Sequence, residues 1–590
     1  MESAKSGVSR RSFVAGAGAV AAAVAVAGQS SGARAAEGAA SEGTANAVSE
    51  FGLEYPWAAE PPEITSDQIE EELDCDVAVV GLGVAGVAAF RAAAEAGAKV
   101  IGIEKADTPS VRSSQYCYIN GTMTDVLGLG TVDIDEVVEH EWEDSDKVAS
   151  YPIIRKFCYN EADVFDWWIA GDDTFVTPTA GSVVSMAPTI SSSEGDSSSS
   201  DGEAGGMPMM NDGTQSIMPM VDLSVDYLNE NMGLYPTRIS VSNHTQLVNA
   251  NLQKGEDAGG VAYFGHYAEQ LIMEGGTCVG VYARDSDTGK YKKVNAAKGV
   301  IMSCGGCGSN KDMITVLYPT MAENGNLSAW PNLDHEGKPT NTGDGYPMGF
   351  WAGAAFSQSR CAMTHVMGGP NDVANMDTSS GLTTPHLRLN YNGKRFMNED
   401  CNCSDCELLM DREPKRKAFL IFDAHLDEQM GDCIVDFPTT PADMDAKVDG
   451  ETVFKADTLE GLFDAIVAYD PDFNKENALE SVERYNQMCA NGYDEDFNKQ
   501  KKYLYPVQDG PFYAERFGIG LCLTTMGGLS SDEDAHVIST ERKIIPGLYC
   551  AGNIQGDRFA VKYPFKLSGA SHAMAMYYGY VAGKNAAQGV

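Results

Sequence analysis

"CDVAVVGLGVAGVAAFRAAAEAGAKVIGIEKA", residues 75–106, has the pattern of a buried strand, a tight turn, a helix and a second strand. Three glycines at the turn have the spacing GxGxxG. Gly81 permits the turn, Gly83 lets backbone N–H groups approach a pyrophosphate, and Gly86 lets the helix pack closely on the sheet. Glu104 ends the second strand, where its carboxylate can accept hydrogen bonds from ribose hydroxyls. The stretch therefore predicts a Rossmann-like unit that binds a dinucleotide.

The composition of the whole chain limits its partners. The 590 residues are 43% hydrophobic, which is typical of a globular protein, and they carry a formal net charge of −42. A surface of this charge repels nucleic acid and anionic lipid, so we exclude both as partners.

The N-terminus predicts export. "SRRSFV" (9–14) contains paired arginines, a weakly apolar run continues to about Ala27, and "ARA" (33–35) offers small residues to a signal peptidase. We interpret residues 1–35 as a twin-arginine signal peptide and residues 36–70 as a polar linker. The apolar run is too short and too rich in alanine to span a membrane, so we expect no direct membrane span and a location outside the cytoplasm.

Two further stretches predict helices, and one predicts disorder. "NALESVERYNQMCANG" (477–492) has an amphipathic pattern that ends at a glycine. "LSGASHAMAMYYGYVAGKNAA" (567–587) predicts a long helix rich in small residues. "SSSEGDSSSSDGEAGG" (191–206) has low complexity, and we expect it to be a disordered loop.

Several motifs, in one order along the chain, resemble the flavoprotein subunit of the fumarate reductase/succinate dehydrogenase family. Besides the first turn, they are "GVIMSCGGCGSN" (299–310), "TGDGYPMGFWAGA" (342–354), "LNYNGKRFMNE" (389–399), "TTMGGLSSD" (524–532) and "IPGLYCAGNIQG" (545–556). The resemblance covers roughly residues 75–588. It implies an α/β fold with a Rossmann-like FAD-binding domain in two halves, 71–360 and 523–590, and an inserted α+β capping domain at 361–522.

The resemblance also implies the residues that contact FAD. The first loop has no histidine to which a flavin could be attached, so we expect non-covalent FAD. Asn553 replaces a common glutamate near the ribityl chain, and a helix beginning near Ser568 would direct its positive end at the flavin C2 carbonyl. Beyond Gly81, Gly83, Gly86 and Glu104, the expected contacts are Ala85, Lys105, Ser113, Ser114, Gly305, Gly306, Asp344, Gly552, Asn553 and Ser568.

The chain departs from the fumarate reductases where they bind substrate. An arginine normally follows the NE motif, where this chain has "DCNCSDC", and Lys566 replaces an arginine that clamps a carboxylate. Two carboxylates need several cationic groups, so we expect a substrate other than fumarate. "DRFAVKYPFKLSG" (557–569) instead resembles a segment of flavin-dependent 3-ketosteroid dehydrogenases in which a tyrosine hydroxyl and a backbone N–H grip a ketone.

By this resemblance, the two donors in this chain are the Tyr563 hydroxyl and the backbone N–H near Leu567. Two donors at a carbonyl oxygen form an oxyanion hole, worth roughly 3 kcal/mol per donor. Arg558 is a candidate third donor or a neighbour of the flavin. Tyr116 and Tyr118, in the first loop, are alternative proton donors. The competing interpretation is that these tyrosines only pack in the interior, with their hydroxyls bonded to other groups.

The resemblance extends to the exported flavin reductases of anaerobic gut bacteria. It implies an FAD-dependent reductase of the C=C bond of an α,β-unsaturated carbonyl compound, an enone or an acrylate. The alternatives are the reverse reaction on a 3-ketosteroid, a fumarate-type carboxylate reductase, and an electron-transfer subunit without catalysis. No CxxCH motif is present, so we expect electrons from a separate donor, a membrane-linked cytochrome.

Fourteen cysteines include a CxCxxC group formed by Cys401, Cys403 and Cys406. Thiolates with this spacing can hold an iron–sulfur cluster, such as [4Fe–4S], or zinc. A fourth ligand is not apparent, and Cys433 and Cys361 are candidates. The alternative is that these cysteines are free thiols, and both interpretations stay open at this point.

Overall fold

The structure is a computed structural model. It describes residues 61–111, 113–172, 233–319, 336–357, 384–431 and 441–590, with short pieces at 47–48, 54–55, 57, 59, 217–220, 227–229, 333–334 and 361–368. The predicted signal peptide, most of the predicted linker, the 191–206 loop and Cys433 lie outside the described residues. All described residues belong to one compact unit, Ala45–Val590.

The main sheet is built around β3 (Ile69–Val80), whose side chains alternate between two hydrophobic clusters. Val77 and Val79 belong to one cluster, and Ala78 and Val80 belong to the other. This alternation is expected for a strand with a period of two residues that is covered on both faces. The sheet therefore separates two cores.

The sheet has eight strands in the order β17-β18-β11-β3-β4-β8, with β10 beside β11 and β9 beside β10. The pairs β18–β11, β11–β3, β3–β4 and β4–β8 are parallel, as in a Rossmann-like unit. The strands are β4 (Val100–Ile103), β8 (Val261–Tyr263), β9 (His266–Glu274), β10 (Thr277–Asp285), β11 (Tyr291–Met302), β17 (His536–Ile538) and β18 (Ile544–Cys550).

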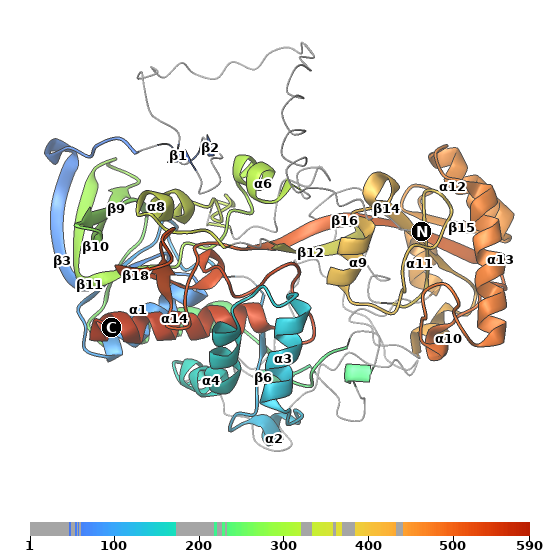
Figure 1. Cartoon of the computed structure of the whole chain (residues 1–590), viewed down its shortest axis with the longest axis horizontal. Coiled ribbons are helices and arrows are strands. Elements are labelled where there is room, and N and C mark those ends of the chain that lie inside the picture. The colour runs from blue at the N-terminus through green and yellow to red at the C-terminus, as the bar shows by residue number, and fades with distance from the viewer. Residues whose placement is uncertain are drawn as a thin grey trace, which may run out of the picture. The chain divides into compact units, whose positions relative to one another are not determined.

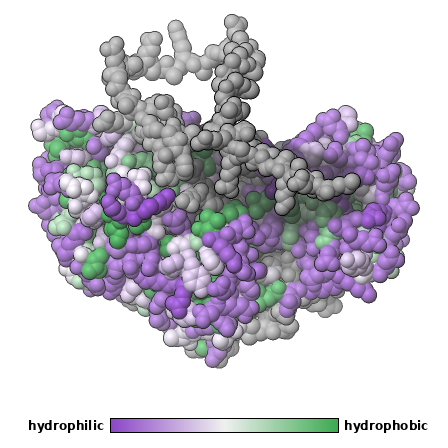
Figure 2. All heavy atoms as spheres, viewed as in Figure 1, coloured by the Kyte–Doolittle hydropathy of each residue, from purple (hydrophilic) through white to green (hydrophobic). Residues whose placement is uncertain are grey.

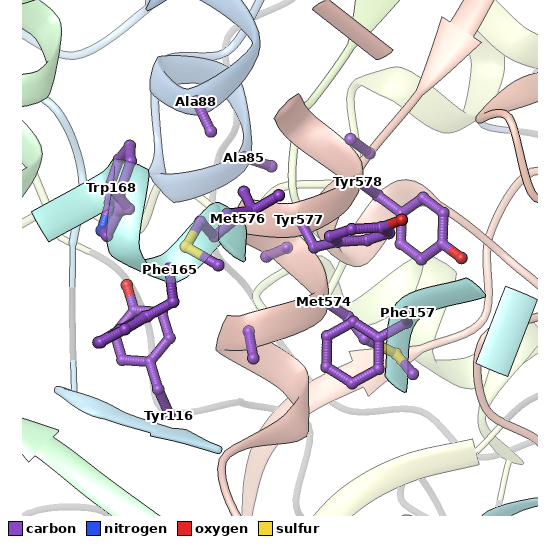
Figure 3. Close-up of a cluster of buried hydrophobic side chains, with 14 of the residues drawn as sticks. Ala85, Ala88, Tyr116, Phe157, Phe165, Trp168, Met574, Met576, Tyr577 and Tyr578 are labelled. Atoms are coloured by element: carbon purple, nitrogen blue, oxygen red, sulfur yellow. The ribbon is translucent and has the colours of Figure 1, made fainter. Parts of the chain in front are cut away.

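The first helix, α1 (Val84–Glu95), is covered by the last helix, α14 (Ala570–Gln588). The backbones approach closely because α14 has glycines at the contact. A Cβ atom on Gly579 would lie 2.2 Å from the carbonyl oxygen of Ala85, and one on Gly583 would lie 2.4 Å from that of Ala89. Figure 3 shows α14 between α1 and α4, with Met574, Tyr577 and Tyr578 in the shared core.

A small antiparallel sheet and two helices extend the first part of the chain. The sheet has the order β5-β7-β6, with β5 (Gln115–Cys117), β6 (Ile217–Pro219) and β7 (Arg238–Val241). The helices are α3 (Ile134–Asp144) and α4 (Tyr151–Ile169). The side chain of Tyr116 in β5 packs against Phe165 of α4, with ring centroids 5.2 Å apart (Figure 3).

The inserted domain is a five-stranded antiparallel sheet with helices, which confirms the predicted α+β class. Its order is β12-β16-β14-β13, with β15 beside β16. Its strands are β12 (Cys361–Gly368), β13 (Leu387–Asn390), β14 (Lys417–Phe422), β15 (Val453–Ala456) and β16 (Phe512–Met526). Its helices are α9 (Cys403–Met410), α10 (Leu426–Gly431), α11 (Pro441–Lys447), α12 (Leu459–Tyr469) and α13 (Lys475–Asn491).

The strand β16 runs through the predicted end of the capping domain at residue 522 without interruption (Figure 1). The exact domain boundaries stay predictions. The remaining helices and strands are β1 (Ala47–Val48), β2 (Glu54–Tyr55), α2 (Thr124–Leu127), α5 (His244–Asp257, packed on α1), α6 (Lys311–Leu317) and α8 (Gly345–Trp351).

The surface is mostly hydrophilic on the face drawn in Figure 2, in keeping with the net charge of −42. Within the described part of the chain, no helix is long and apolar enough to span a bilayer.

Candidate active site

The predicted dinucleotide turn is present, and hydrogen bonds to the Glu104 carboxylate hold its backbone in place. The backbone N–H of Leu82 donates to Glu104 Oε2 at 2.7 Å, and that of Ala106 donates to Oε1 at 3.0 Å. Gly81 has φ +87°. Burial raises the pKa of Glu104, although the backbone N–H groups and Lys105 oppose this effect. Each oxygen keeps a further lone pair that could accept a hydrogen bond from a ribose hydroxyl.

The close contacts at the turn leave no space for residues larger than glycine. A Cβ atom on Gly86 would lie 1.7 Å from the carbonyl oxygen of Gly81, and one on Gly81 would lie 2.6 Å from that of Ser303. These contacts show that the helix must approach the sheet at glycine distance, as the sequence predicts.

The structure brings together predicted cofactor residues that are far apart in the chain. Lys105 Nζ donates to Asp344 Oδ2 at 2.6 Å, and Ser114 Oγ lies 2.7 Å from Ser240 Oγ. Asn553 Nδ2 donates to Thr524 Oγ1 at 2.6 Å. Left-handed backbone occurs at Ser113 (φ +56°), Gly305 (φ +72°) and Gly552 (φ +77°). Gly306 follows Gly305, Ala85 lies in the first turn of α1, and Ser568 directly precedes Gly569.

The last helix begins at Ala570, two residues later than the predicted start near Ser568. Gly569 precedes it with φ +90°, and a Cβ atom there would lie 2.3 Å from the carbonyl carbon of Tyr116. The contact with the first loop therefore places the start of the helix after residue 569, which must adopt a conformation that only glycine adopts easily.

The hydrogen-bonding needs of the buried Arg558 guanidinium indicate whether these residues fit FAD. Its guanidinium is 1% exposed, and neither terminal nitrogen has a hydrogen-bond partner within the described residues. Burial lowers the pKa of Arg558 to about 10. A buried cation needs acceptors, and the oxygens of an anionic dinucleotide can supply them. Together with the glycine turn, the residues present fit FAD.

Tyr563 is 3% exposed, and its hydroxyl oxygen accepts a hydrogen bond from the Ser571 backbone N–H at 3.2 Å. Its own O–H hydrogen has no acceptor in the described part of the chain. Burial raises the pKa of Tyr563, so the phenol stays protonated. Its ring lies 5.4 Å from that of Phe559. Leu567 is fully buried, and its N–H faces the carboxyl group of Glu141.

The hydroxyls of Tyr116 and Tyr118 are both hydrogen-bonded within the protein. Tyr116 Oη lies 2.6 Å from His244 Nε2, and Tyr118 Oη donates to Asp166 Oδ1 at 2.7 Å. Burial raises the pKa of both phenols. Their proposed role as proton donors stays a prediction, and these contacts favour the packing interpretation for both.

The CxCxxC group lies at the start of α9. Cys406 is buried and Cys401 is partly buried, and the position of the Cys403 side chain is outside the described residues. A hydrogen bond from the Cys401 thiol lowers the pKa of Cys406. The described residues contain no group of three or more side chains placed to hold a metal ion. Burial raises the pKa of both Cys304 and Cys307 to about 12, so these two remain thiols.

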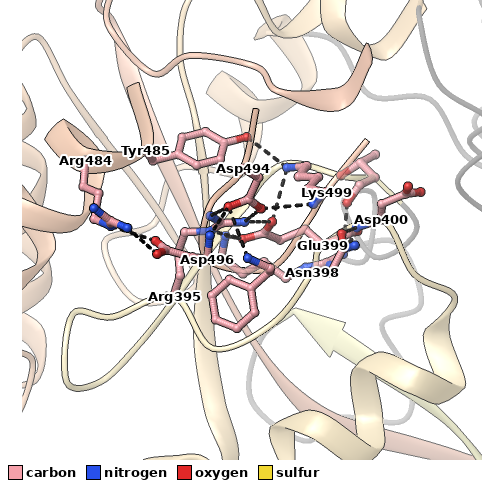
Figure 4. Close-up of polar contacts among 12 residues, drawn as sticks. Arg395, Asn398, Glu399, Asp400, Arg484, Tyr485, Asp494, Asp496 and Lys499 are labelled. Atoms are coloured by element: carbon pink, nitrogen blue, oxygen red, sulfur yellow. Dashed lines mark hydrogen bonds and ion pairs between the residues drawn. The ribbon is translucent and has the colours of Figure 1, made fainter. Parts of the chain in front are cut away.

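A buried ionic network holds the loop before α9 (Figure 4). Arg395 bonds Glu399 at 2.7 Å and Asp494 at 2.9 Å, and Lys499 Nζ lies 3.3 Å from Glu399 and 2.9 Å from Tyr485 Oη. Burial opposes the ionisation of Glu399, but Lys499 and Arg395 outweigh it and lower its pKa. The network occupies the protein interior and fixes the backbone at 395–399.

The sequence did not indicate Glu141, His244 or Asp166. Each lies far along the chain from the residue that it faces, and none belongs to a motif. The only available signal for Glu141 was its position on the inner face of an amphipathic helix, where the other buried residues of α3 are Val137 and Val138.

Comparison with known proteins places the chain in a family. The family model described as "FAD binding domain" matches residues 76–564. Vinyl phenol reductase of Lactiplantibacillus plantarum is 29% identical over 343 residues, covering 53% of this chain and 65% of that protein. A probable fumarate reductase of Shewanella frigidimarina is 27% identical, covering 54% of this chain and 48% of that protein. The chain thus spans about half the length of the curated relatives that it matches.

Among solved structures, 3-ketosteroid-Δ4-(5α)-dehydrogenase of Rhodococcus jostii in complex with 4-androstene-3,17-dione has the same fold. The TM-score is 0.64 with 20% sequence identity, and the match covers 92% of this chain and 100% of that one. An open flavocytochrome c3 fumarate reductase matches with a TM-score of 0.55 and 19% identity, covering 92% of this chain and 85% of that one.

Proposed function

We propose that this chain, which belongs to the FAD binding domain family of fumarate reductase and succinate dehydrogenase flavoproteins, reduces the C=C bond of an α,β-unsaturated carbonyl compound. Bound and reduced FAD supplies the hydride. The observation that carries the proposal is the hydroxyl of Tyr563, which is buried, protonated and without an acceptor for its own hydrogen among the described residues.

Tyr563 would act on the carbonyl oxygen of the substrate. Hydride addition at the β-carbon builds negative charge on that oxygen, and a hydrogen bond from the phenol stabilises it. The Ser571 N–H, which donates to the Tyr563 oxygen, holds the hydroxyl at the first turn of α14. The positive end of this helix favours negative charge nearby.

The charges around this segment support a substrate that presents one oxygen rather than two carboxylates. Lys562 contacts Asp405 at 2.5 Å, and Lys566 lies 3.8 Å from Asp144. Both lysines therefore have acidic neighbours that offset their charge. A dicarboxylate would have to compete with these aspartates for the lysines.

We further propose that FAD binds without a covalent bond, that the protein is exported, and that a separate donor supplies its electrons. FAD is held without a covalent bond. The twin-arginine pattern at residues 9–14 supports export as a folded, flavin-loaded protein. Electrons then come from a separate donor, a membrane-linked cytochrome.

An anaerobic substrate screen tests the reaction. The purified protein is supplied with reduced viologen as electron donor and with enones, acrylates and fumarate in turn. Oxidation of the viologen with an enone or an acrylate, and not with fumarate, is expected. Turnover of fumarate alone would contradict the proposal.

Dehydrogenation of a 3-ketosteroid is a second candidate function. The fold shared with the Rhodococcus jostii enzyme and the Tyr563 segment favour it. The same protein preparation, given a saturated 3-ketosteroid and an artificial electron acceptor, distinguishes the two: reduction of the acceptor in the absence of viologen would favour the dehydrogenase.

Replacing Tyr563 with phenylalanine removes the proposed donor and keeps the ring. We expect turnover to fall at least tenfold, because one hydrogen bond to a developing oxyanion is worth roughly 3 kcal/mol. The flavin content should be unchanged. Steady-state rates of the two proteins, normalised to bound FAD, check this. Tyr513→Phe in the inserted domain is the matched control that should keep its rate, because the buried Tyr513 donates its hydroxyl hydrogen to Asp445. An unchanged rate in Tyr563→Phe would remove this hydroxyl from the reaction.

A [4Fe–4S] cluster on Cys401, Cys403 and Cys406 is a separate part of the proposal. The CxCxxC spacing and the contact between the Cys401 and Cys406 thiols support it. Protein purified without oxygen is expected to contain about four iron atoms and as many acid-labile sulfides per chain. Cys401→Ser should lose them and keep FAD. Protein that contains flavin but neither iron nor sulfide would show that these cysteines are free thiols.

A further inference from the structure

The backbone directly before Tyr563 is strained. The Lys562 N–H donates to the Ala560 carbonyl oxygen at 2.6 Å and closes a turn of three residues, in which the central Val561 has φ +63°. A three-residue turn with a positive central φ is rare and strained, and a positive φ is a marked outlier for a β-branched side chain. Among the described non-glycine residues with positive φ, Val561 is the only β-branched one. Such strain persists only where the surrounding structure enforces it, and it is common at functional sites.

The turn controls the direction of Tyr563 because the chain on both sides of it is held. Ala560, at the start of the turn, is buried. Pro564 restricts the backbone of Tyr563 to extended conformations. The Lys566 carbonyl oxygen accepts a backbone hydrogen bond at 2.8 Å from the segment that precedes β7. The conformation of Val561 therefore decides where the Tyr563 ring points.

An ion pair from the inserted domain holds the last residue of the turn. Lys562 Nζ donates to Asp405 Oδ1 at 2.5 Å. Asp405 lies in the first turn of α9, where Asn402 Nδ2 donates to its other carboxylate oxygen at 3.0 Å. Asp144 on α3 lies farther from Lys562 Nζ, at 3.9 Å, and it is also 3.8 Å from Lys566 Nζ. The contact with Asp405 is therefore the shorter of the two ion pairs that Lys562 forms.

Both members of this ion pair are partly shielded from water. The Lys562 side chain is 18% exposed, and that of Asp405 is 33% exposed. Burial opposes the charge of Lys562, but the Asp405 carboxylate and the more distant Asp144 and Asp146 outweigh it and raise the pKa of the lysine. Salt screens a partly buried pair less than an exposed one. The contact can therefore hold Lys562 in place against the strain at Val561.

We propose that Asp405 is a positioning residue for Tyr563: its ion pair with Lys562 keeps Val561 in the strained turn, and the turn directs the Tyr563 hydroxyl to the substrate. This inference rests on the proposed function, because it explains how the hydrogen-bond donor of that reaction is aimed. Asp405 itself does not touch the substrate. It acts from the inserted domain, through Lys562, on the segment between β18 and α14.

Asp405→Asn tests the proposal, because the amide keeps the shape of the side chain and loses its charge. We expect kcat to fall at least fivefold while the flavin content stays unchanged. The effect must pass through the Tyr563 hydroxyl, so Asp405→Asn should cause no further loss in a Tyr563→Phe background. Equal losses in the two backgrounds would overturn the proposal.

Val561→Gly separates the strain from the charge. Glycine adopts a positive φ without steric cost, so the turn should then persist without the ion pair. We expect Asp405→Asn to lower kcat less than twofold in the Val561→Gly background. A full fivefold loss in that background would show that Asp405 does not act by holding the strained turn, and it would overturn the proposal.

Glu71→Gln is the matched control. Glu71 in β3 pairs with Lys292 of β11 at 2.8 Å, and the lysine side chain is 16% exposed, close to the value for Lys562. This pair also joins segments that are distant in the chain, but neither of its residues has a positive φ. The control should therefore keep the wild-type kcat. A loss equal to that in Asp405→Asn would show a general effect of removing an ion pair, and it would overturn the proposal.

Hydrogen–deuterium exchange of the flavin-loaded protein separates failure of this inference from failure of the proposed function, because it needs no substrate. The Lys562 N–H in the turn and the Ser571 N–H, which donates to Tyr563 Oη at 3.2 Å, report on the segment. Peptides that contain these two amides should exchange faster in Asp405→Asn than in the wild type and in Glu71→Gln. Faster exchange in a protein that reduces no enone would contradict the proposed function and support the role of Asp405 in holding the segment. Wild-type exchange in Asp405→Asn would overturn the inference.

If Asp405→Asn does not fold, Lys562→Gln removes the same ion pair from its other member. We expect the same loss of kcat and the same faster exchange at the Ser571 N–H. Wild-type kcat in Lys562→Gln would overturn the proposal.

Discussion

Gly86→Ala is expected to give a protein that contains no flavin. A Cβ atom at this position would lie 1.7 Å from the carbonyl oxygen of Gly81 and 2.7 Å from Ser303 Oγ. Both distances are far below van der Waals contact, so α1 would have to move away from the turn. That movement would displace the N–H groups that are directed at the pyrophosphate.

The flavin absorbance of the purified protein measures this effect. Gly461→Ala, in the first turn of α12, is the matched control, because a Cβ atom there would lie 3.1 Å from the nearest atom, Thr458 Oγ1. The control should retain its full flavin content, and both proteins should have similar circular dichroism. Full flavin content in Gly86→Ala would show that the turn is not the pyrophosphate site.

Glu399→Ala is expected to lower the free energy of unfolding by roughly 3–5 kcal/mol. Glu399 is completely buried and accepts from Arg395 and Lys499, as Figure 4 shows. Removing this carboxylate leaves Lys499, which is itself completely buried, with only the Tyr485 hydroxyl at hydrogen-bond distance among the contacts described above. An uncompensated buried cation is far more costly than a missing surface ion pair.

Urea denaturation at neutral pH measures the loss. Glu480→Ala is the matched control, since Glu480 forms a 3.6 Å ion pair with Lys394 in which both side chains are largely exposed. Its stability should change little. The contribution of Glu399 should also weaken in acid, because its lowered pKa means that the folded state resists protonation that the unfolded chain accepts. Equal stability of Glu399→Ala and Glu480→Ala would contradict the expected role of the network.

Sequence patterns correctly predicted those elements whose structure depends mainly on residues close together in the chain. The GxGxxG turn is present, and the helix predicted at 477–492 is α13, which ends where Gly492 adopts φ +69°. The antiparallel sheet of the inserted domain agrees with the class implied by the family resemblance. The continuity of β16 through residue 522 was not predicted, because strand pairing with β12 and β14 depends on residues more than 90 positions away.

The candidate site was predicted less completely. The motifs indicated Tyr563 and Arg558. The structure adds that, within the described residues, the Tyr563 hydroxyl hydrogen has no acceptor and the two terminal nitrogens of Arg558 have no hydrogen-bond partner. Glu141 could not be predicted, because it meets residues 562–567 only after α3 packs on a segment more than 400 positions later. For the same reason, the sequence could not show that the Tyr116 hydroxyl is bonded to His244.

The close packing of α14 on α1 has a consequence for biosynthesis. The nucleotide turn leaves the ribosome well before Gly579 and Gly583, which cover the helix after it. The nucleotide turn therefore lacks its covering helix until residue 583 has been synthesised, and we expect FAD to be retained only after that point.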